Sequence, residues 1–293
     1  MNKTVFTGAG VAIVTPMNKD FSINYEKLGE LIDWQIENGT DSIIICGTTG
    51  ESSTMSDEEH IDSISFAVER AKGKVPIIAG AGSNDTSYAI WLSKESKRVG
   101  ADALLQVTPY YNKTSQRGLV AHFNAIADAT DLPIILYNVP SRTGVNIALD
   151  TYKEIAKHPN IVAVKEASGD LSKIAEIAAN CDLDIYSGND EQILPILSLG
   201  GKGVISVLSN VIPKETHEIC KLFFENKNAE ALALVKKTLK LANMLFCDVN
   251  PIPVKAALNL MGKNVGSCRL PLVDLDENKN AMLKQCLAEY NLL

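Results

Sequence analysis

The sequence lacks three features that mark nucleic-acid-binding, membrane and disulfide-dependent proteins. Acidic residues outnumber basic ones by 35 to 28 and no cluster of Lys and Arg occurs, which argues against a nucleic-acid partner. No apolar stretch approaches the roughly 20 residues of a membrane helix, and the apolar N-terminal segment is short and has no cleavage site. The six cysteines show no CxxC spacing. We therefore expect free thiols and a cytoplasmic protein.

Nucleotide and metal sites are also poorly supported by the sequence. The Gly-rich stretch "GTTGE" at 47–51 does not have the GxxxxGK[ST] spacing of a phosphate-binding loop. The four histidines are dispersed along the chain, which is typical of surface or core residues. We expect no metal and no cofactor.

What the sequence does contain is a regular alternation of strand-like and helix-like segments. Eight β-rich runs, each followed by a helical pattern, span about the first 220 of 293 residues, which predicts an α/β protein with a closed (β/α)8 TIM barrel rather than an open sheet. The strand-like runs cover 10–16, 42–47, 75–82, 101–109, 133–140, 161–168, 183–188 and 203–209.

The last part of the chain has a different pattern. Three amphipathic segments, at 228–248, 250–262 and 277–293, predict a C-terminal extension of three helices. We therefore divide the chain into a catalytic barrel, 1–226, and a helical extension, 227–293. No linker-like or low-complexity stretch separates the two.

Chemistry in such a barrel belongs to the C-terminal ends of the strands and the loops that follow. Several of these ends are rich in Gly, hydroxyl and aromatic residues. They read "GTTGE" (47–51), "TPYYNK" (108–113), "YNVPSRTG" (137–144), "KEASG" (165–169) and "SGND" (187–190). We expect them to converge at one rim.

Lys165 follows directly on the apolar run 161–164. Alternate strand residues share a face, so Ile161, Ala163 and Lys165 are expected to point the same way, into the barrel. A free lysine has a pKa near 10.4, which leaves only about 1 amine in 2,500 neutral at pH 7, but burial lowers that pKa. A buried Lys165 is thus a candidate imine-forming nucleophile. The ordinary alternative is a lysine that reaches solvent or pairs with a carboxylate.

Four further side chains complete a hypothetical site for a keto acid. Tyr137 stands at the end of the preceding strand and should point to the same face as Lys165, with its phenol beside the amine. It would act there as a proton shuttle, or simply pack as a core aromatic. Thr48 and Thr49 offer hydroxyls between glycines, where backbone N–H groups can approach a ligand. Arg142 suits a carboxylate, although a loop arginine is more often only solvated.

Tyr110 and Tyr111 are adjacent, so in an extended segment their rings point in opposite directions. One could face the site and the other a neighbouring chain. The alternative is that they are surface or interface aromatics, which applies more to Tyr110 than to Tyr111.

Taken together, "GTTGES", "TPYYNK", "YNVPSRTG", "VKEASGD" and "GVISV", in this order, closely resemble the dihydrodipicolinate synthase family. The resemblance covers essentially the whole chain, including "NPIPVK" at 250–255. It implies a barrel in a homotetramer of tight dimers that condenses pyruvate with L-aspartate-4-semialdehyde on the diaminopimelate route to lysine. It also implies no metal or cofactor, because an imine supplies the electron sink.

The resemblance assigns the proton chemistry residue by residue. Lys165 would form the imine with pyruvate, and Tyr137 would carry protons to and from that intermediate. Thr49 would link Tyr137 to Tyr111, which the family supplies from the second subunit of the dimer. Thr48 would support this relay.

The resemblance also assigns the substrate contacts. Thr49 and the main chain of Ile205 would hold pyruvate, and Arg142 would anchor the carboxylate of the semialdehyde at the entrance. Gly188 would leave space at the rim.

Two alternatives stay open on the sequence alone. N-acetylneuraminate lyase and the keto-deoxy sugar acid aldolases resemble this chain in barrel, lysine and tyrosine, but they usually lack an arginine at the position of Arg142. A barrel that only binds a keto acid as a sensor would not need the full set of Lys165, Tyr137, Thr49 and Arg142.

Feedback inhibition by lysine, which the resemblance implies for some members, is expected to be weak or absent here. Asp57 stands where a histidine is usual and Tyr88 where a glutamate is usual, and the lost carboxylate removes a contact to the ammonium. The positions that match the lysine-sensitive pattern are Ser52, His60, Asn84 and Tyr110.

Overall fold

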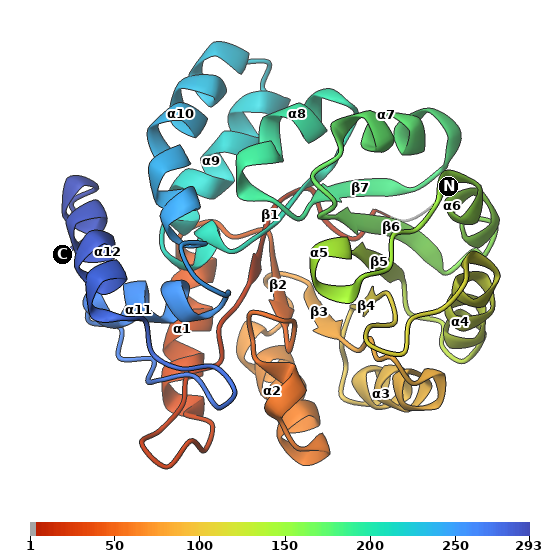
Figure 1. Ribbon diagram of the computed structural model, residues 1–293, viewed down its shortest axis with the longest axis horizontal. Helices are drawn as coiled ribbons and strands as arrows, with labels where there is room; N and C mark the ends of the chain where they lie inside the picture. Colours follow the sequence, from red (N-terminus) through yellow and green to blue (C-terminus); the bar gives the residue numbers. More distant parts are fainter. Residues whose placement is uncertain (1–3) are drawn as a thin grey trace.

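The computed structural model describes residues 4–293 and contains the expected barrel. Eight parallel strands pair in chain order and β8 closes on β1, which confirms the (β/α)8 prediction (Figure 1). The strands are β1 Gly8–Ala12, β2 Ser42–Ile45, β3 Ile77–Gly80, β4 Ala103–Val107, β5 Ile134–Asn138, β6 Ile161–Glu166, β7 Asp184–Ser187 and β8 Gly203–Ser206.

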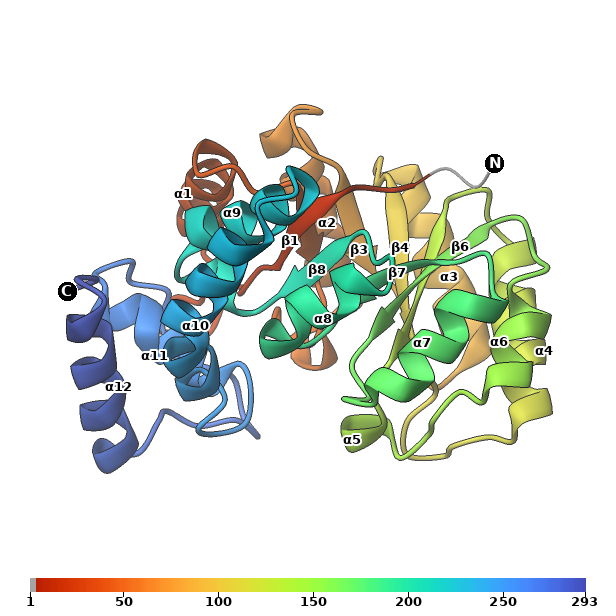
Figure 2. The same cartoon turned by 90° about the horizontal axis from the view of Figure 1, so that it is seen from above.

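Helices cover the outside of the barrel (Figures 1 and 2). They are α1 Tyr25–Glu37, α2 Asp57–Ala71, α3 Thr86–Arg98, α4 Gln116–Asp128, α6 Leu149–Ile155, α7 Leu171–Asn180, α8 Ile193–Ser198 and α9 Pro213–Phe224. An additional short helix, α5 Pro140–Thr143, lies in a segment that we expected to be a loop. Across residues 4–293, no helix combines the length and the apolar character needed to cross a membrane.

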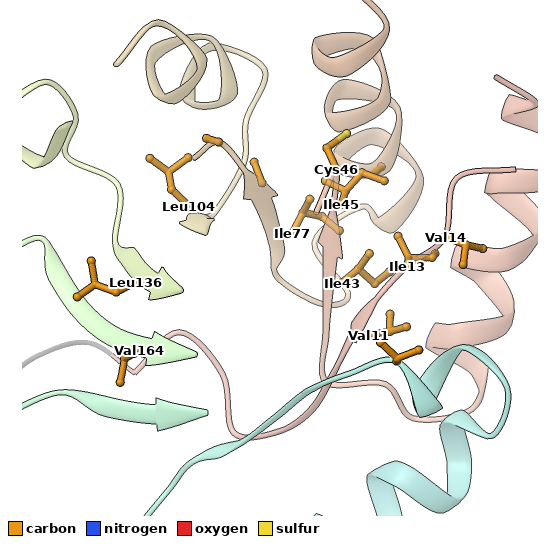
Figure 3. Packing of buried hydrophobic residues seen from close by; sticks show 14 of the residues in the cluster. Val11, Ile13, Val14, Ile43, Ile45, Cys46, Ile77, Leu104, Leu136 and Val164 are labelled. Carbon is orange, nitrogen blue, oxygen red and sulfur yellow. The ribbon is translucent and has the colours of Figure 1, made fainter. Parts of the chain in front are cut away.

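The strand side chains form two buried layers because successive residues point to opposite faces. Val11, Ile43, Ile77 and Leu136 pack outward against the helices, as Figure 3 shows from close by. The inner layer fills the barrel with side chains from the strands; it includes Ala12, Ile44, Ile78, Ala103, Leu105, Ile135, Ala163 and Ile205. The barrel is therefore a packed core and not a pore.

The strand that carries Lys165 departs from simple alternation. The register between β5 and β6 shifts, so that Ile134 pairs with Ile161 but Ile135 pairs with Ala163. Because one residue is inserted there, Ile161 packs in the outer layer, while Val162 and Ala163 both face inward. The expectation that Ile161 shares the face of Lys165 is thus wrong.

The N-terminal end of the barrel is closed by an aromatic pair. Phe6 and Tyr186 stack with ring centroids 4.3 Å apart, and the Tyr186 hydroxyl donates a hydrogen bond of 2.6 Å to the Phe6 carbonyl. Both side chains are buried. Access to the interior is left to the opposite end, where the strands finish.

The C-terminal residues form the three expected helices, α10 Asn228–Met244, α11 Ile252–Leu260 and α12 Glu277–Glu289. Helix α10 lies beside α9, and α11 and α12 lie together at one side of the barrel (Figures 1 and 2). The division of the chain at residue 226 stays a prediction.

One buried ion pair joins the extension to the barrel. Lys255 Nζ of α11 lies 2.7 Å from Glu51 Oε1, in the loop after β2, and both side chains are almost completely buried. The same Nζ donates to the carbonyls of Thr15 at 3.1 Å and Ser267 at 2.7 Å. This contact ties α11 to the loop that contains Thr48 and Thr49.

Candidate active site

A cavity of about 500 Å³ opens at the carboxyl ends of the strands. The predicted residues that line it are Thr48, Thr49, Tyr137, Arg142, Lys165 and Gly188, and the extension contributes Asn243, Phe246 and Asn250. The structure therefore brings together most of the candidate residues at the rim where a barrel enzyme holds its substrate.

Lys165 is the cation at the base of this cavity. It is 6% exposed, and β6 holds it in register with Tyr137 on one side and Tyr186 on the other. Its Nζ lies 4.4 Å from the centroid of the Tyr137 ring, and no group among residues 4–293 accepts a hydrogen bond from it. Burial lowers the pKa of Lys165 to about 8, with Asp190 acting against this shift and Arg142 adding to it. The amine is thus buried and has no fixed partner.

Tyr137 is 8% exposed and stands directly beside Lys165. Burial raises the pKa of its phenol, while the charge of Arg142 and a hydrogen bond with the Thr48 hydroxyl act in the opposite direction. A phenol held in this way remains protonated at neutral pH and can donate or accept a proton next to the lysine.

The two threonines of "GTTGE" differ from the expected arrangement. The hydroxyl bonded to the Tyr137 phenol belongs to Thr48, whereas Thr49 was expected to make that link. Thr49 is buried instead, and its Oγ1 accepts a hydrogen bond of 2.9 Å from Asn250 Nδ2. Adjacent residues in a turn point in different directions, so only one of them can reach the phenol.

Arg142 lies on the short helix α5 at the mouth of the cavity. Its Nη2 donates to the Asn250 carbonyl at 3.1 Å, and no carboxylate among the described residues forms an ion pair with it. The remaining N–H groups are free for an anionic ligand, as expected for a carboxylate anchor.

Of the candidates Gly188 and Ile205, only Gly188 lines the cavity. A Cβ at Gly188 would lie 2.6 Å from the Ala167 Cβ and 2.9 Å from the Glu166 carbonyl, so only glycine allows the loops after β6 and β7 to approach this closely. Ile205 is completely buried in the inner layer and is not among the residues that line the cavity.

Tyr111 is a second candidate that does not line the cavity. Its side chain is 92% exposed, and its backbone is in the left-handed region with φ 65°. A large aromatic ring that faces solvent in this conformation does not contribute to the site of its own chain.

The candidates for lysine binding fall into two places. Ser52, His60 and Tyr110 line a second cavity of about 480 Å³, which also touches Thr48, Tyr137 and Arg142. Asn84 lines a different cavity. The Tyr88 hydroxyl, also in the second cavity, donates to Asp57 Oδ1 at 2.5 Å.

Sequence reasoning missed two residues of the site. Asn250 contacts both Thr49 and Arg142 although it lies in the C-terminal extension, and the only signal was the motif "NPIPVK". Asp190 is buried, accepts hydrogen bonds from the main-chain N–H groups of Val207 and Leu208, and acts electrostatically on Lys165. Asp190 was visible only as part of "SGND".

The comparisons with known proteins agree with one another. Residues 5–290 match the model of the dihydrodipicolinate synthetase family. The chain is 56% identical over 292 residues to a 4-hydroxy-tetrahydrodipicolinate synthase of Lachnoclostridium phytofermentans, covering 99% of both chains. It is 53% identical over 290 residues to the synthase of the same name from Caldicellulosiruptor bescii, covering 99% of this chain and 98% of that one.

A solved structure gives the same result at the level of the fold. Dihydrodipicolinate synthase of Acinetobacter baumannii, crystallised with pyruvate, superimposes with a TM-score of 0.96 at 46% identity, covering 99% of this chain and 100% of that chain. The likeness therefore extends over the barrel and the C-terminal helices together.

Proposed function

This chain belongs to the dihydrodipicolinate synthetase family, and from that we propose that it condenses pyruvate with L-aspartate-4-semialdehyde to 4-hydroxy-tetrahydrodipicolinate, with Lys165 holding the pyruvate as an imine. This is the first committed step of the diaminopimelate route to lysine. The observation that supports the assignment of Lys165 is its buried amine, which has no hydrogen-bond partner in the part of the chain that the structure describes and a pKa lowered to about 8.

The first half of the reaction uses the lysine and the tyrosine. Neutral Nζ of Lys165 attacks the C2 carbonyl of pyruvate, and the resulting hydroxyl leaves as water after taking a proton from Tyr137. Loss of a methyl proton then converts the imine into an enamine with a nucleophilic C3. With a pKa of about 8, roughly a tenth of the amine is neutral at pH 7, compared with about 1 in 2,500 for an unperturbed lysine.

The pyruvate carboxylate is held by the loop after β2. The hydroxyl of Thr49 and the main-chain N–H groups of Thr48 and Thr49 have no acceptor among residues 4–293, and both residues line the cavity. Adjacent N–H groups in a turn form a concave site for an anion. This leaves the keto group of pyruvate directed at Lys165.

The second half brings in the semialdehyde. Arg142 holds its carboxylate at the mouth, C3 of the enamine bonds to the aldehyde carbon, and the aldehyde oxygen takes a proton to become the 4-hydroxyl group. The amino group of the semialdehyde then attacks C2 and displaces Nζ. The ring closes, Lys165 returns to its amine, and one water is released overall.

The quaternary structure is part of the proposal. The exposed Tyr111 and the second cavity, which reaches Thr48 and Tyr137 from the surface, fit a tight dimer in which Tyr111 of each chain completes the other chain's relay. Two such dimers would form a homotetramer. We place the protein in the cytoplasm, which the free state of all six cysteines supports.

The direct test is to trap the imine. The protein is treated with pyruvate and sodium borohydride, digested, and analysed by peptide mass spectrometry. A single reduced adduct on Lys165 is expected. Lys165→Arg and a sample without pyruvate are the controls and should give no adduct.

The acceptor is tested separately. With pyruvate as the donor, the untreated enzyme should consume aspartate semialdehyde far faster than a sugar aldehyde such as D-glyceraldehyde, and Arg142→Ala should remove most of this preference. An adduct combined with a preference for sugar aldehydes would keep the imine and overturn the acceptor assignment. No adduct on a folded sample would overturn the role of Lys165.

A further inference from the structure

Asn250 lies at the junction of the two substrate anchors, although it belongs to the C-terminal extension. It falls between α10 and α11, is 6% exposed, and lines the cavity. Its side-chain Nδ2 donates to Thr49 Oγ1 at 2.9 Å, and its main-chain carbonyl accepts from Arg142 Nη2 at 3.1 Å. One residue therefore contacts the group proposed to hold pyruvate and the group proposed to hold the semialdehyde.

The side-chain contact determines what the Thr49 hydroxyl can do. A hydroxyl has one proton and two lone pairs, and the amide of Asn250 occupies one of the lone pairs. No group among the described residues accepts the hydroxyl proton, so it is available to a ligand in the cavity that Thr49 lines. Asn250 thus holds Thr49 as a hydrogen-bond donor toward a carboxylate.

The main-chain contact acts on Arg142. Within residues 4–293, the Asn250 carbonyl is the only hydrogen-bond acceptor of this guanidinium. Arg142 sits on a four-residue helix at an exposed rim, where a long side chain is otherwise free to adopt several rotamers. The position of the Asn250 backbone therefore restricts the orientation of the guanidinium.

We propose that Asn250 is a positioning residue that couples the two carboxylate anchors, its side chain fixing Thr49 for pyruvate and its main chain fixing Arg142 for the semialdehyde. The inference rests on the proposed function. Because the two contacts use different parts of the residue, a substitution of the side chain separates them.

The informative substitution is Asn250→Asp, which keeps the size of the side chain. The carboxylate would accept the Thr49 proton and reverse the hydrogen bond, and it would add a negative charge near the carboxylate of the keto acid. We expect the KM for pyruvate to rise at least about tenfold, the loss of one hydrogen bond to a charged group, while the KM for the semialdehyde changes less than about threefold. Asn250→Ser adds no charge to the site and should therefore raise the KM for pyruvate by a smaller factor.

The matched control is Asn259→Ala. Asn259 also lies in the extension and also makes two hydrogen bonds, from its Nδ2 to the Gly266 carbonyl and to its Oδ1 from the Val265 N–H, but it does not line the active-site cavity. This variant should lower thermal stability without raising the KM for pyruvate selectively. A purely structural role for Asn250 would make its variants behave like Asn259→Ala.

Coupling to Thr49 is the sharpest readout. In a Thr49→Val background, Asn250→Ser should have no further effect on the pyruvate concentration that gives half-maximal borohydride trapping. An unchanged KM for pyruvate in both Asn250 variants, an equal rise in both KM values, or effects that add to those of Thr49→Val would each overturn the inference. Trapping on Lys165 in the unmodified protein would leave the proposed function standing in all three cases.

Discussion

Among residues 4–293 two lysines are buried, and they differ in the hydrogen-bond acceptors around their amines. Lys165 and Lys255 are 6% and 2% exposed. Around Lys255 the protein provides the Glu51 carboxylate and the carbonyls of Thr15 and Ser267 as acceptors. Around Lys165 it provides no hydrogen-bond acceptor within residues 4–293, only the face of an aromatic ring. Burial alone does not make a lysine reactive; burial without acceptors does.

The difference follows from what each lysine connects. Glu51 has a left-handed backbone with φ 59°, and its second carboxylate oxygen accepts from the Arg269 main-chain N–H at 2.8 Å. Lys255 therefore joins the extension to the "GTTGE" loop, and its charge is paired within that network. Lys165 is the last residue but one of β6 and faces an open cavity, so its amine is left free to react with the substrate.

Replacing Lys165 should have the largest effect on activity. Lys165→Met removes the nucleophile while it keeps most of the side-chain volume, so the rate of condensation should fall at least about a thousandfold and borohydride trapping should disappear. Steady-state kinetics and mass spectrometry measure these losses. Circular dichroism should show an unchanged fold. Activity within tenfold of the parent would contradict the assignment of Lys165 as the reactive lysine of the two.

Replacing Lys255 should instead affect stability. Lys255→Met leaves Glu51 buried without its cation, which should lower the free energy of unfolding by about 3–5 kcal/mol in urea denaturation. The double variant Glu51→Gln with Lys255→Met should recover part of this loss, because no unpaired charge then remains. A loss below about 1 kcal/mol would show that the network is not needed to hold the loop.

The pH dependence of trapping reports the environment of Lys165 directly. Because only the neutral amine attacks, the rate of adduct formation at low pyruvate concentration should rise about tenfold per pH unit below pH 8 and level off above it. The measurement is a series of timed borohydride quenches from pH 6 to pH 9.5. A rate that still rises steeply at pH 9.5 would mean that burial does not lower the pKa of this lysine.

The lowered pKa of Lys165 should also make the free energy of unfolding depend on pH. The pKa of Lys165 is lower in the folded than in the unfolded chain, so between pH 8 and about 10.4 the unfolded state binds more protons and the free energy of unfolding rises with pH. The cost of the buried charge, on the order of 3 kcal/mol, is present in full below pH 8. Lys165→Met should therefore be more stable than the parent at pH 7, and this advantage should shrink toward pH 10.

The smallest effect is expected from free lysine added as an inhibitor. The second cavity is lined by Ser52, His60, Tyr88 and Tyr110 but by no Asp or Glu among the described residues, so an ammonium there meets no equivalent of Glu51. We expect less than twofold inhibition at 1 mM lysine, because the missing charged contact lowers the affinity for lysine. Sub-millimolar inhibition in a rate assay would refute this, and Tyr88→Glu should increase sensitivity.

The parts of the site that were predictable are those that follow from strand periodicity. Tyr137 and Lys165 are each the last residue but one of neighbouring parallel strands and both point inward, so their contact could be inferred without coordinates. The position of Ile161 could not, because a one-residue bulge leaves no signal in an apolar run.

Contacts between distant segments were not predictable either. Asn250 meets Thr49 from 201 positions away, and Lys255 meets Glu51 across 204. No local pattern encodes how the extension folds back over the rim. The choice between Thr48 and Thr49 as partner of Tyr137 likewise depends on the turn conformation, which two identical neighbouring residues do not reveal.

The stacked pair of Phe6 and Tyr186 occupies the N-terminal end of the barrel, so substrates have to reach Lys165 from the end where the strands finish. Lys165 is buried at the base of the cavity and Arg142 lies at its mouth, so we expect the molecule that reacts with the amine to enter first and the second molecule to follow. A semialdehyde bound alone would stand between the keto acid and its nucleophile. We therefore expect ordered binding, with the keto acid ahead of the aldehyde, and inhibition of the reaction by an excess of the aldehyde.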